Sequence, residues 1–325
     1  MEDKLNKGLL LTIAIPVYNT KPELLKRALL SIPDSKYIGV IVYDDGSTDY
    51  EYRTLIRDWL KNDPNFSFMN SSRFIFNRSN ENKGLGAVRN TLIRKIDSDY
   101  VMFLDSDDEV MTDNFGEIIM YLLDNKVDVI YGNISLSIGD NVIEERWWDF
   151  VKTRLMIPYF TTCNFYNPKF LMNHNIFYSE DRRVFEDIMF SVRLFYVTEV
   201  VHQGLRRKYI DKSIYKYNLE GCSLTRVDED TKGRVKVLAS DLEYWINEIK
   251  HFYMRIKSDS YKEQLKPHLF NRVRYEVVKL TEYIMRLNGD FYTYKFLLDN
   301  LKPYKIDEIL RSEERRVGKE CRSRW

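Results

Sequence analysis

The sequence YVMFLDSDDEV, residues 100–110, places a short uncharged run directly before a cluster of acids. Asp105, Asp107 and Asp108 follow the run within four positions. Core packing does not call for three carboxylates at one place, because buried charges need partners. We therefore expect a buried strand that delivers these acids to a functional edge of a sheet.

Strand and helix patterns alternate on both sides of this stretch. The expected strands are 9–17, 38–43, 73–77, 100–104 and 127–131, and the expected helices are 22–31, 54–60, 86–96 and 115–123. A capping box, Thr20 to Glu23, marks the start of the first helix. Such alternation predicts an α/β fold with a mostly parallel central sheet flanked by helices. In such folds ligands bind beyond the carboxyl ends of the strands.

The pattern changes along the rest of the chain. After residue 132 we expect short strands, a helix over 185–197 and a hairpin over 200–217, and from about residue 228 long helical patterns at 235–256 and 267–287. We predict a domain boundary near Arg226, with the site in residues 1–226 and a C-terminal helical region in 227–310.

Residues 311–325 differ in character from the chain before them. They show no apolar period and hold six basic and three acidic residues. Read back into codons, the stretch resembles a translated DNA-sequencing adapter, so we expect a non-native tail and exclude it from fold reasoning. The alternative is a genuine basic tail that contacts an anionic surface.

Composition narrows the class of protein. The chain of 325 residues is 44% hydrophobic, enough for a substantial core, and its apolar runs fall short of the roughly 20 residues of a membrane span. The N-terminus MEDKLNKG does not resemble a signal peptide, so we expect a cytoplasmic protein, with peripheral contact at the inner face of the cell membrane left open. The net charge of +1, or −2 without the tail, gives no reason to expect a nucleic-acid partner.

A second acid cluster follows the second expected strand. Asp44 and Asp45 close that strand as Asp105 and Asp107 close the fourth, so both clusters should meet at one rim. Acids at such places also cap helices, which is the alternative interpretation. A carboxylate pair beside a polyphosphate is how proteins usually hold Mg²⁺ or Mn²⁺. We therefore expect a divalent cation at this rim.

A glycine-containing stretch, NENKGLGAVRN over residues 80–90, lies between the two clusters. Glycines before a helix let backbone amides face an anion, and Arg89 could reach a phosphate or a base. The stretch matches neither G-x-G-x-x-G nor the phosphate-loop pattern. An NAD-dependent oxidoreductase on a similar sheet is therefore disfavoured.

Five ordered motifs resemble those of the family 2 glycosyltransferases of the GT-A fold. They are Ile15-Pro16-Val17-Tyr18-Asn19, Asp44-Asp45-Gly46-Ser47-Thr48-Asp49, Asn82-Lys83-Gly84 with Arg89-Asn90, Leu104-Asp105-Ser106-Asp107-Asp108, and Glu186-Asp187. The resemblance covers roughly residues 9–226. It implies an inverting enzyme with a nucleotide-sugar donor, often a UDP-sugar, and a divalent cation, Mn²⁺ or Mg²⁺.

The resemblance also implies a role for each matching residue. Asp45 holds the nucleobase, Arg89 helps to fix the nucleotide and Asp105 faces the ribose. Asp107 binds the metal, and Asp108 is the second candidate ligand. The other nucleotide-sugar-binding candidates are Pro16, Tyr18, Asn19, Lys83, Gly84, Ser106 and Glu186.

Inverting transfer needs a base that takes the proton of the acceptor hydroxyl. Asp187, in the sequence VFEDIMF over residues 184–190, matches the base position of the family at the start of a helix. The alternative for Asp187 is an acid stabilised by the helix dipole.

These observations together predict a bacterial-type, metal-dependent inverting glycosyltransferase. Its partners would be a nucleotide-sugar donor and a glycan or lipid-linked glycan acceptor in surface polysaccharide synthesis. A homo-oligomer formed through the C-terminal helices is left open. The alternative function is a non-catalytic nucleotide-sugar-binding or scaffold subunit. The sequence does not identify the sugar, the nucleobase or the acceptor.

Overall fold

The computed structural model describes residues 8–69, 72–138, 141–145, 157, 160–181, 185–202, 206–218 and 231–286. The chain divides into two compact units, one of residues 1–154 and 158–224 and one of residues 155–157 and 225–325. The boundary that we predicted at Arg226 and the tail over 311–325 lie outside the described residues.

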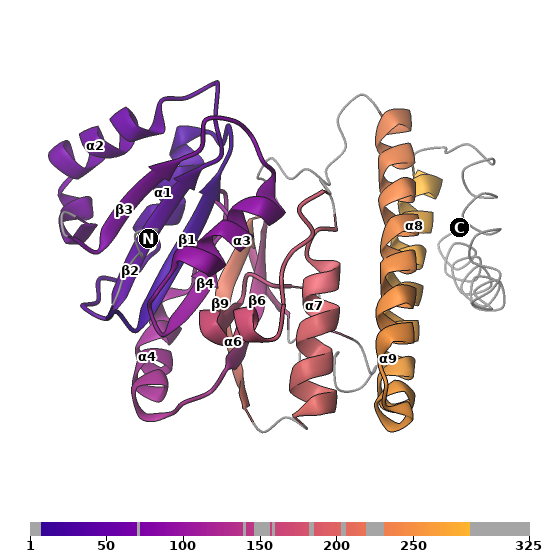
Figure 1. Ribbon diagram of the computed structural model, residues 1–325. Coiled ribbons are helices and arrows are strands. Elements are labelled where there is room, and N and C mark those ends of the chain that lie inside the picture. The colour runs from indigo at the N-terminus through magenta and orange to yellow at the C-terminus, as the bar shows by residue number, and fades with distance from the viewer. Residues whose placement is uncertain are drawn as a thin grey trace. The chain divides into compact units, whose positions relative to one another are not determined.

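The first unit is built on one mixed sheet with the strand order β3–β2–β1–β4–β8–β6–β9–β5. Figure 1 shows the strands β1 to β4 of this sheet side by side. Its parallel half consists of β1 (Leu11–Val17), β2 (Ile38–Asp44), β3 (Phe74–Arg78) and β4 (Tyr100–Phe103). The other half contains β5 (Glu109–Val110), β6 (Val129–Ile138), β7 (Asn141–Glu145), β8 (Asn164–Tyr166) and β9 (Arg207–Asn218). Here β8 pairs antiparallel with both β4 and β6, whereas β9 runs parallel to β6.

Helices follow the strands of the parallel half, as the sequence predicted. They are α1 (Pro22–Leu30), α2 (Tyr52–Asn62) and α3 (Leu85–Lys95), with α4 (Phe115–Asp124) after β4 and the short β5. Two further helices, α6 (Pro168–Asn173) and α7 (Ile188–Phe195), come after β8. Short helical segments η1 (Pro64–Met69), η2 (Thr112–Asn114) and η3 (Tyr196–Val201) complete the described helices of this unit. The predicted α/β architecture is confirmed.

Apolar side chains point to both faces of the central strands, which explains why both faces of the sheet are covered by helices. Leu11, Ile13 and Ile15 of β1 belong to one buried cluster together with residues of α1 and α4. Ala14 belongs to the opposite cluster, which contains residues of α3, α6 and α7. Side chains point alternately to the two faces of a strand, and full burial of a large apolar side chain stabilises the fold by about 1.5–3 kcal/mol. An apolar strand such as β1 is therefore most stable between two helical layers.

The predicted hairpin over residues 200–217 is wrong. Residues 196–201 form a π-helical segment, and residues 207–218 form one strand that pairs with β6 and β5. Ile214 and Tyr215 are fully buried in the same cluster as Ile130 and Ile134 of β6. Pairing with a strand distant in the sequence buries these side chains, and the local pattern does not reveal such a partner.

The described part of the second unit consists mainly of two helices in contact, α8 (Thr231–Arg255) and α9 (Asp259–Arg286). The prediction that the second of these starts at Pro267 is wrong, because the helix begins eight residues earlier and continues through the proline. Leu265, Leu269 and Val273 are buried on both sides of the proline, and this burial favours the continuous helix. None of the helices in the described ranges is long and apolar enough to cross a bilayer.

Candidate active site

The predicted site residues lie at the carboxyl edge of the parallel strands. Residues Val17 and Asp44 are neighbours at the ends of β1 and β2. The loop after β2 begins at the same edge, because the backbone amide of Asp45 donates to the carbonyl of Val17 at 2.8 Å. On the other side of β1, the amide of Leu104 donates to the carbonyl of Ala14 at 3.0 Å. The two acid clusters therefore follow β2 and β4, the strands on either side of β1, and lie at one rim of the sheet, as predicted.

Asp45 organises the glycine-containing loop before α3. Its carboxylate accepts hydrogen bonds from the amides of Lys83 at 3.0 Å and Gly84 at 2.8 Å, and from the hydroxyl of Ser79 at 3.0 Å. Asp45 is buried, whereas the side chain of Lys83 is exposed. The loops after β2 and β3 are therefore joined through one carboxylate, and contact of Asp45 with a nucleobase stays a prediction.

Gly46 lets these two loops approach each other closely. Its φ is +73°, and a Cβ added there would lie 2.6 Å from the carbonyl carbon of Glu81. A glycine is needed at this position both for the backbone conformation and for the space.

Asn19 joins the loop after β1 to the loop after β2. Its side-chain oxygen accepts hydrogen bonds from the backbone amides of Thr48 at 2.9 Å and Asp49 at 3.1 Å. Its backbone amide donates to the Ser47 hydroxyl at 3.0 Å. Asn19 adopts a φ of +49°, a conformation that asparagine tolerates better than most residues. The other two candidates of this motif differ in exposure, because Pro16 is buried in β1 and Tyr18 is 49% exposed.

Thr20 contacts the loop after β4 that carries Asp105, Asp107 and Asp108, here named the acid loop, instead of capping α1. Its hydroxyl forms a hydrogen bond of 2.6 Å with the hydroxyl of Ser106, and Tyr52 donates to the carbonyl of Thr20. The N-cap residue of α1 is Lys21, and its side chain makes no capping hydrogen bond. The predicted capping box is wrong because the Thr20 hydroxyl bonds across the site to Ser106.

The three acids after β4 have different surroundings. Asp108 is buried; one carboxylate oxygen accepts from the hydroxyl of Tyr215 at 2.6 Å and the other from the amide of Asn218 at 2.8 Å. Asp105 and Asp107 are partly exposed. Burial, followed by the charges of Asp105 and Asp107, raises the pKa of Asp108 well above its usual range. Asp108 faces β9, so Asp107 is the better placed of the two candidate metal ligands.

The backbone of the acid loop is fixed from two sides. The carbonyl of Asp107 accepts from the Arg27 guanidinium at 2.8 Å and from the side-chain amide of Asn218 at 3.0 Å. Glu109 continues this network through ion pairs with Arg27 at 3.3 Å and Lys216 at 3.1 Å. Neighbouring segments thus hold the loop in one conformation.

The donor set of this loop fits a hard divalent cation. Carboxylate oxygens of Asp105 and Asp107 are the ligands that Mg²⁺ or Mn²⁺ prefers, with phosphate oxygens and water completing the shell. In the described ranges, no group of three or more histidine, cysteine, aspartate or glutamate side chains is arranged to hold a metal by itself. A cation bound here would therefore need oxygens from water or from a bound phosphate group for part of its shell.

Arg89 lies inside the protein between two acids. One terminal nitrogen contacts Asp105 at 2.6 Å and the other contacts Glu186 at 3.0 Å. The guanidinium is 3% exposed and packs near the rings of Tyr178 and Phe103, at 5.1 and 5.8 Å from their centroids. The structure therefore joins the acid loop to the segment that carries Asp187.

Glu186 and Asp187 immediately precede α7. Glu186 is 9% exposed, and burial together with the neighbouring charge of Asp187 raises its pKa to about 7. Asp187 is half-buried, and its side chain makes no capping hydrogen bond to α7. Asp187 therefore does not cap α7 through its side chain, and its roles as a base or as an acid stabilised by the helix dipole both stay predictions.

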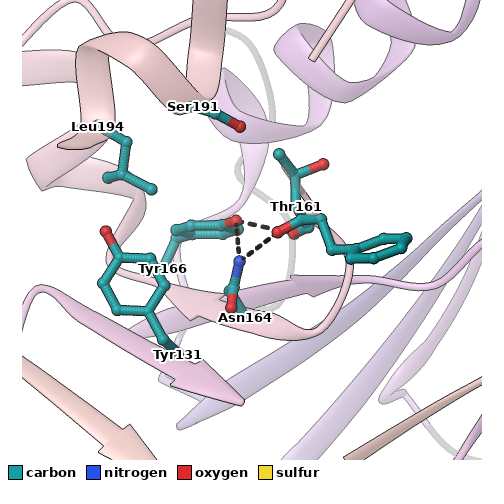
Figure 2. Close-up of a pocket in the computed structure, with 7 residues that line it drawn as sticks. Tyr131, Thr161, Asn164, Tyr166, Ser191 and Leu194 are labelled. Carbon is teal, nitrogen blue, oxygen red and sulfur yellow. Dashed lines mark hydrogen bonds between the residues drawn. The ribbon is translucent and has the colours of Figure 1, made fainter. Parts of the chain in front are cut away.

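A pocket elsewhere in the first unit contains none of the predicted site residues. It is lined by Tyr131, Phe160, Thr161, Asn164, Tyr166, Ser191 and Leu194 (Figure 2). The side-chain amide of Asn164 donates to the carbonyl of Phe160 and the hydroxyl of Tyr166, which donates in turn to the carbonyl of Thr161. These polar groups bond to one another, so we interpret the pocket as part of the packing between the sheet and α7.

Sequence reasoning missed the contacts through which Thr20, Arg27, Tyr215 and Asn218 shape the site. Their own motifs give no signal, because each acts through a contact with a distant segment. Tyr215 and Asn218, for example, are 107 and 110 positions from Asp108. Only the pairing of β9 with β5 and β6 brings them to the acid loop.

Residues 12–189 match the sequence profile of Glycosyl transferase family 2. The match covers more than half of the chain, which therefore belongs to this family of glycosyltransferase enzymes.

Curated relatives agree with this assignment. The chain is 25% identical to glycosyltransferase GlyA of Streptococcus pneumoniae in an alignment of 234 residues that covers 67% of the chain and 32% of GlyA. It is 22% identical to the uncharacterised glycosyltransferase YibD of Escherichia coli, over 91% of the chain and 89% of YibD. An N-acetylglucosaminyltransferase of Rhizobium meliloti is 28% identical over 42% of the chain and 32% of its own length. The chain thus spans about a third of GlyA and most of YibD.

Solved structures show the same fold. Residues 1–349 of Staphylococcus aureus TarS, in complex with UDP-GlcNAc, superpose with a TM-score of 0.65 at 16% identity, covering 91% of this chain and 80% of that one. The mannosyltransferase PcManGT of Pyrobaculum calidifontis, in complex with GDP-Man and Mn²⁺, gives a TM-score of 0.55 at 15% identity, over 94% and 86% of the two chains. The GT-A fold predicted from the sequence is confirmed.

Proposed function

We propose that the protein transfers a sugar from a UDP-sugar, with inversion, to a glycan or lipid-linked glycan acceptor in surface polysaccharide synthesis. The observation that supports this most strongly is the double contact of Arg89 with Asp105 and Glu186. It places the acid loop, where a donor diphosphate would bind, next to the segment that carries the proposed base.

Support for the donor comes from proteins of similar fold. TarS was solved with UDP-GlcNAc and PcManGT with GDP-Man, and several relatives are named N-acetylglucosaminyltransferases. UDP-N-acetylglucosamine is therefore the first donor to test. The exposed ring of Tyr18, next to Asn19 at the end of β1, offers a flat surface for a base.

In the proposed mechanism each group has one task. Asp187 accepts the proton of the acceptor hydroxyl as that oxygen attacks the anomeric carbon from the face opposite the nucleotide. Asp107, with Asp105 beside it in place of the buried Asp108, would hold a divalent cation, which when bound would supply positive charge that stabilises the leaving diphosphate. Tyr215, Asn218 and Arg27 keep the acid loop in place through the contacts described above.

The experiment that tests the proposal measures nucleotide release by the full-length chain. UDP-N-acetylglucosamine, UDP-glucose, UDP-galactose and GDP-mannose are supplied in turn with Mn²⁺, Mg²⁺ or a chelator. We expect release from one UDP-sugar that the chelator abolishes and that Asp107→Ala removes. Asp113→Ala is the matched control, because Asp113 is an exposed acid of the following turn. Binding of UDP without release from any donor would instead favour the non-catalytic binding or scaffold subunit.

The remaining parts of the proposal concern location and assembly. We place the enzyme on the cytoplasmic side, at the inner face of the membrane where lipid-linked acceptors are found. We assign the site to residues 1–226 and an oligomerisation or membrane-contact role to the helical region 227–310. Sedimentation of the full chain with and without anionic vesicles tests the last two roles.

A further inference from the structure

We infer that Arg89 and Glu186 are positioning residues that hold Asp187 beside the acid loop, and that neither binds the nucleotide sugar directly. The inference rests on the proposed function, since that function gives Asp187 its task. It changes the roles that the family resemblance implies for both residues.

The first line of support is enclosure. Both terminal nitrogens of Arg89 are engaged, one by Asp105 at 2.6 Å and one by Glu186 at 3.0 Å. The rings of Tyr178 and Phe103 lie near the guanidinium. With 3% of its surface exposed, Arg89 has little area left for a phosphate or a base. Glu186, at 9%, directs its carboxylate to Arg89 and away from solvent.

The second line of support is the backbone before Asp187. Phe185 has a φ of +61°, which is unusual for a bulky residue. Such a conformation persists only where the surrounding structure holds it. Here the amide of Ser179 donates to the carbonyl of Glu186 at 2.9 Å, and the Arg89 contact fixes the Glu186 side chain. The turn that sets the direction of Asp187 is thus held through both the backbone and the side chain of Glu186.

The third line of support is the close packing of α3 against this turn. A Cβ added to Gly86 would lie 2.1 Å from the carbonyl oxygen of Ser179 and 3.4 Å from the Cβ of Glu186. Helix α3 therefore approaches Ser179 and Glu186 at a position where only glycine fits. Gly86 and Arg89 are three positions apart, so they share one face of the helix. This face of α3 is the surface that positions Asp187.

The kinetic test compares two replacements of Glu186 in the full-length chain. Glu186→Gln keeps the size of the side chain and an oxygen that can accept from Arg89, whereas Glu186→Ala removes the contact. We expect Glu186→Ala to lower kcat about 100-fold, the effect of a small displacement of a catalytic group. Donor KM should change by less than about threefold, and Glu186→Gln should keep most of the activity.

A matched control is available on the same two segments. Arg94 of α3 contacts Glu180 at 3.4 Å, and both side chains are about half exposed. Arg94→Gln therefore removes an ion pair between α3 and the same loop without touching the enclosed pair. We expect wild-type kcat and KM for this variant. A rise in donor KM at unchanged kcat in Glu186→Ala would overturn the inference, because it would mean that Glu186 binds the donor.

A second measurement does not depend on turnover. Hydrogen exchange of the amides of residues 185–191 reports how firmly the turn before α7 is held. We expect exchange to be at least about tenfold faster in Glu186→Ala and unchanged in Arg94→Gln. Unchanged exchange in Glu186→Ala would overturn the positioning role even in an active enzyme. Absence of transfer by the wild type, combined with faster exchange in Glu186→Ala, would overturn the proposed function and leave the Arg89–Glu186 contact supported as the anchor of the turn.

Discussion

Replacement of Tyr215 by phenylalanine removes one hydroxyl that serves two partners of the acid loop. This hydroxyl donates to the buried carboxylate of Asp108 at 2.6 Å and accepts from the amide of Asp105 at 3.2 Å. Asp108 keeps its hydrogen bond from the amide of Asn218. A hydrogen bond of this kind contributes about 1–3 kcal/mol, and a buried amide left without a partner costs a similar amount. We expect Tyr215→Phe to lower the free energy of unfolding by about 2–3 kcal/mol.

The same change should also weaken binding of UDP with Mn²⁺, because the loop that presents Asp105 and Asp107 loses a contact. Loss of a residue that orients metal ligands typically reduces metal affinity about 10–100-fold. Urea unfolding gives the stability, and calorimetric titration of UDP in the presence of Mn²⁺ gives the affinity.

Tyr209→Phe serves as the control for this prediction. Tyr209 lies on the same strand, and its hydroxyl donates at 2.8 Å to Glu199, a residue of η3 and not of the acid loop. We expect a similar loss of stability with unchanged UDP affinity. Equal weakening of UDP binding in both variants, or a Tyr215→Phe variant as stable as the wild type, would refute the reasoning.

Three further predictions concern the loops and the buried acid. Asp45→Ala should destabilise the protein by about 2–4 kcal/mol in urea unfolding, because the backbone amides of Lys83 and Gly84 lose their acceptor; a change below about 0.5 kcal/mol would contradict this. Gly46→Ala should destabilise by more than about 1 kcal/mol, because φ is +73° and the new Cβ meets Glu81; unfolding at the wild-type midpoint would count against it. The raised pKa of Glu186, about 7 against 4.5, means that the native state holds its proton more tightly, so this contribution to stability is complete below pH 4.5 and is lost as the pH rises through 7. The free energy of unfolding of Glu186→Gln should therefore rise relative to that of the wild type as the pH increases from 5 to 8. A difference between the two proteins that does not change with pH would argue against the raised pKa.

Much of the fold followed from the sequence because its signals are local. Apolar strands such as β1 and β4 end in polar turns, and the helices that follow have clear apolar faces. Since carboxyl ends of parallel strands meet at one edge, the convergence of Asp45 and Asp105 could be predicted from their places alone. The register and order of the second half of the sheet could not, because β9 pairs with β6, some 80 residues away.

The residue roles in the site were harder to predict for the same reason. The partner of Arg89 on one side is Glu186, 97 positions later in the sequence, and nothing local to either residue indicates that they meet. Asp108 follows Asp107 directly, yet it turns toward β9 because Tyr215 and Asn218 offer hydrogen bonds there. Motif spacing therefore located the site, whereas the burial and partners of each side chain required the tertiary structure.

The most direct test of the account compares UDP release from UDP-N-acetylglucosamine by the wild type and by Asp187→Asn, with Mn²⁺ and glycan acceptors present. If Asp187 is the base, the variant should lose about 10²–10⁴-fold in kcat. Its affinity for UDP should stay within about threefold of the wild type, since the base acts only on the acceptor. A variant that turns over at the wild-type rate would contradict the central claim that this rim of the sheet is the active site of a glycosyltransferase with Asp187 as its base.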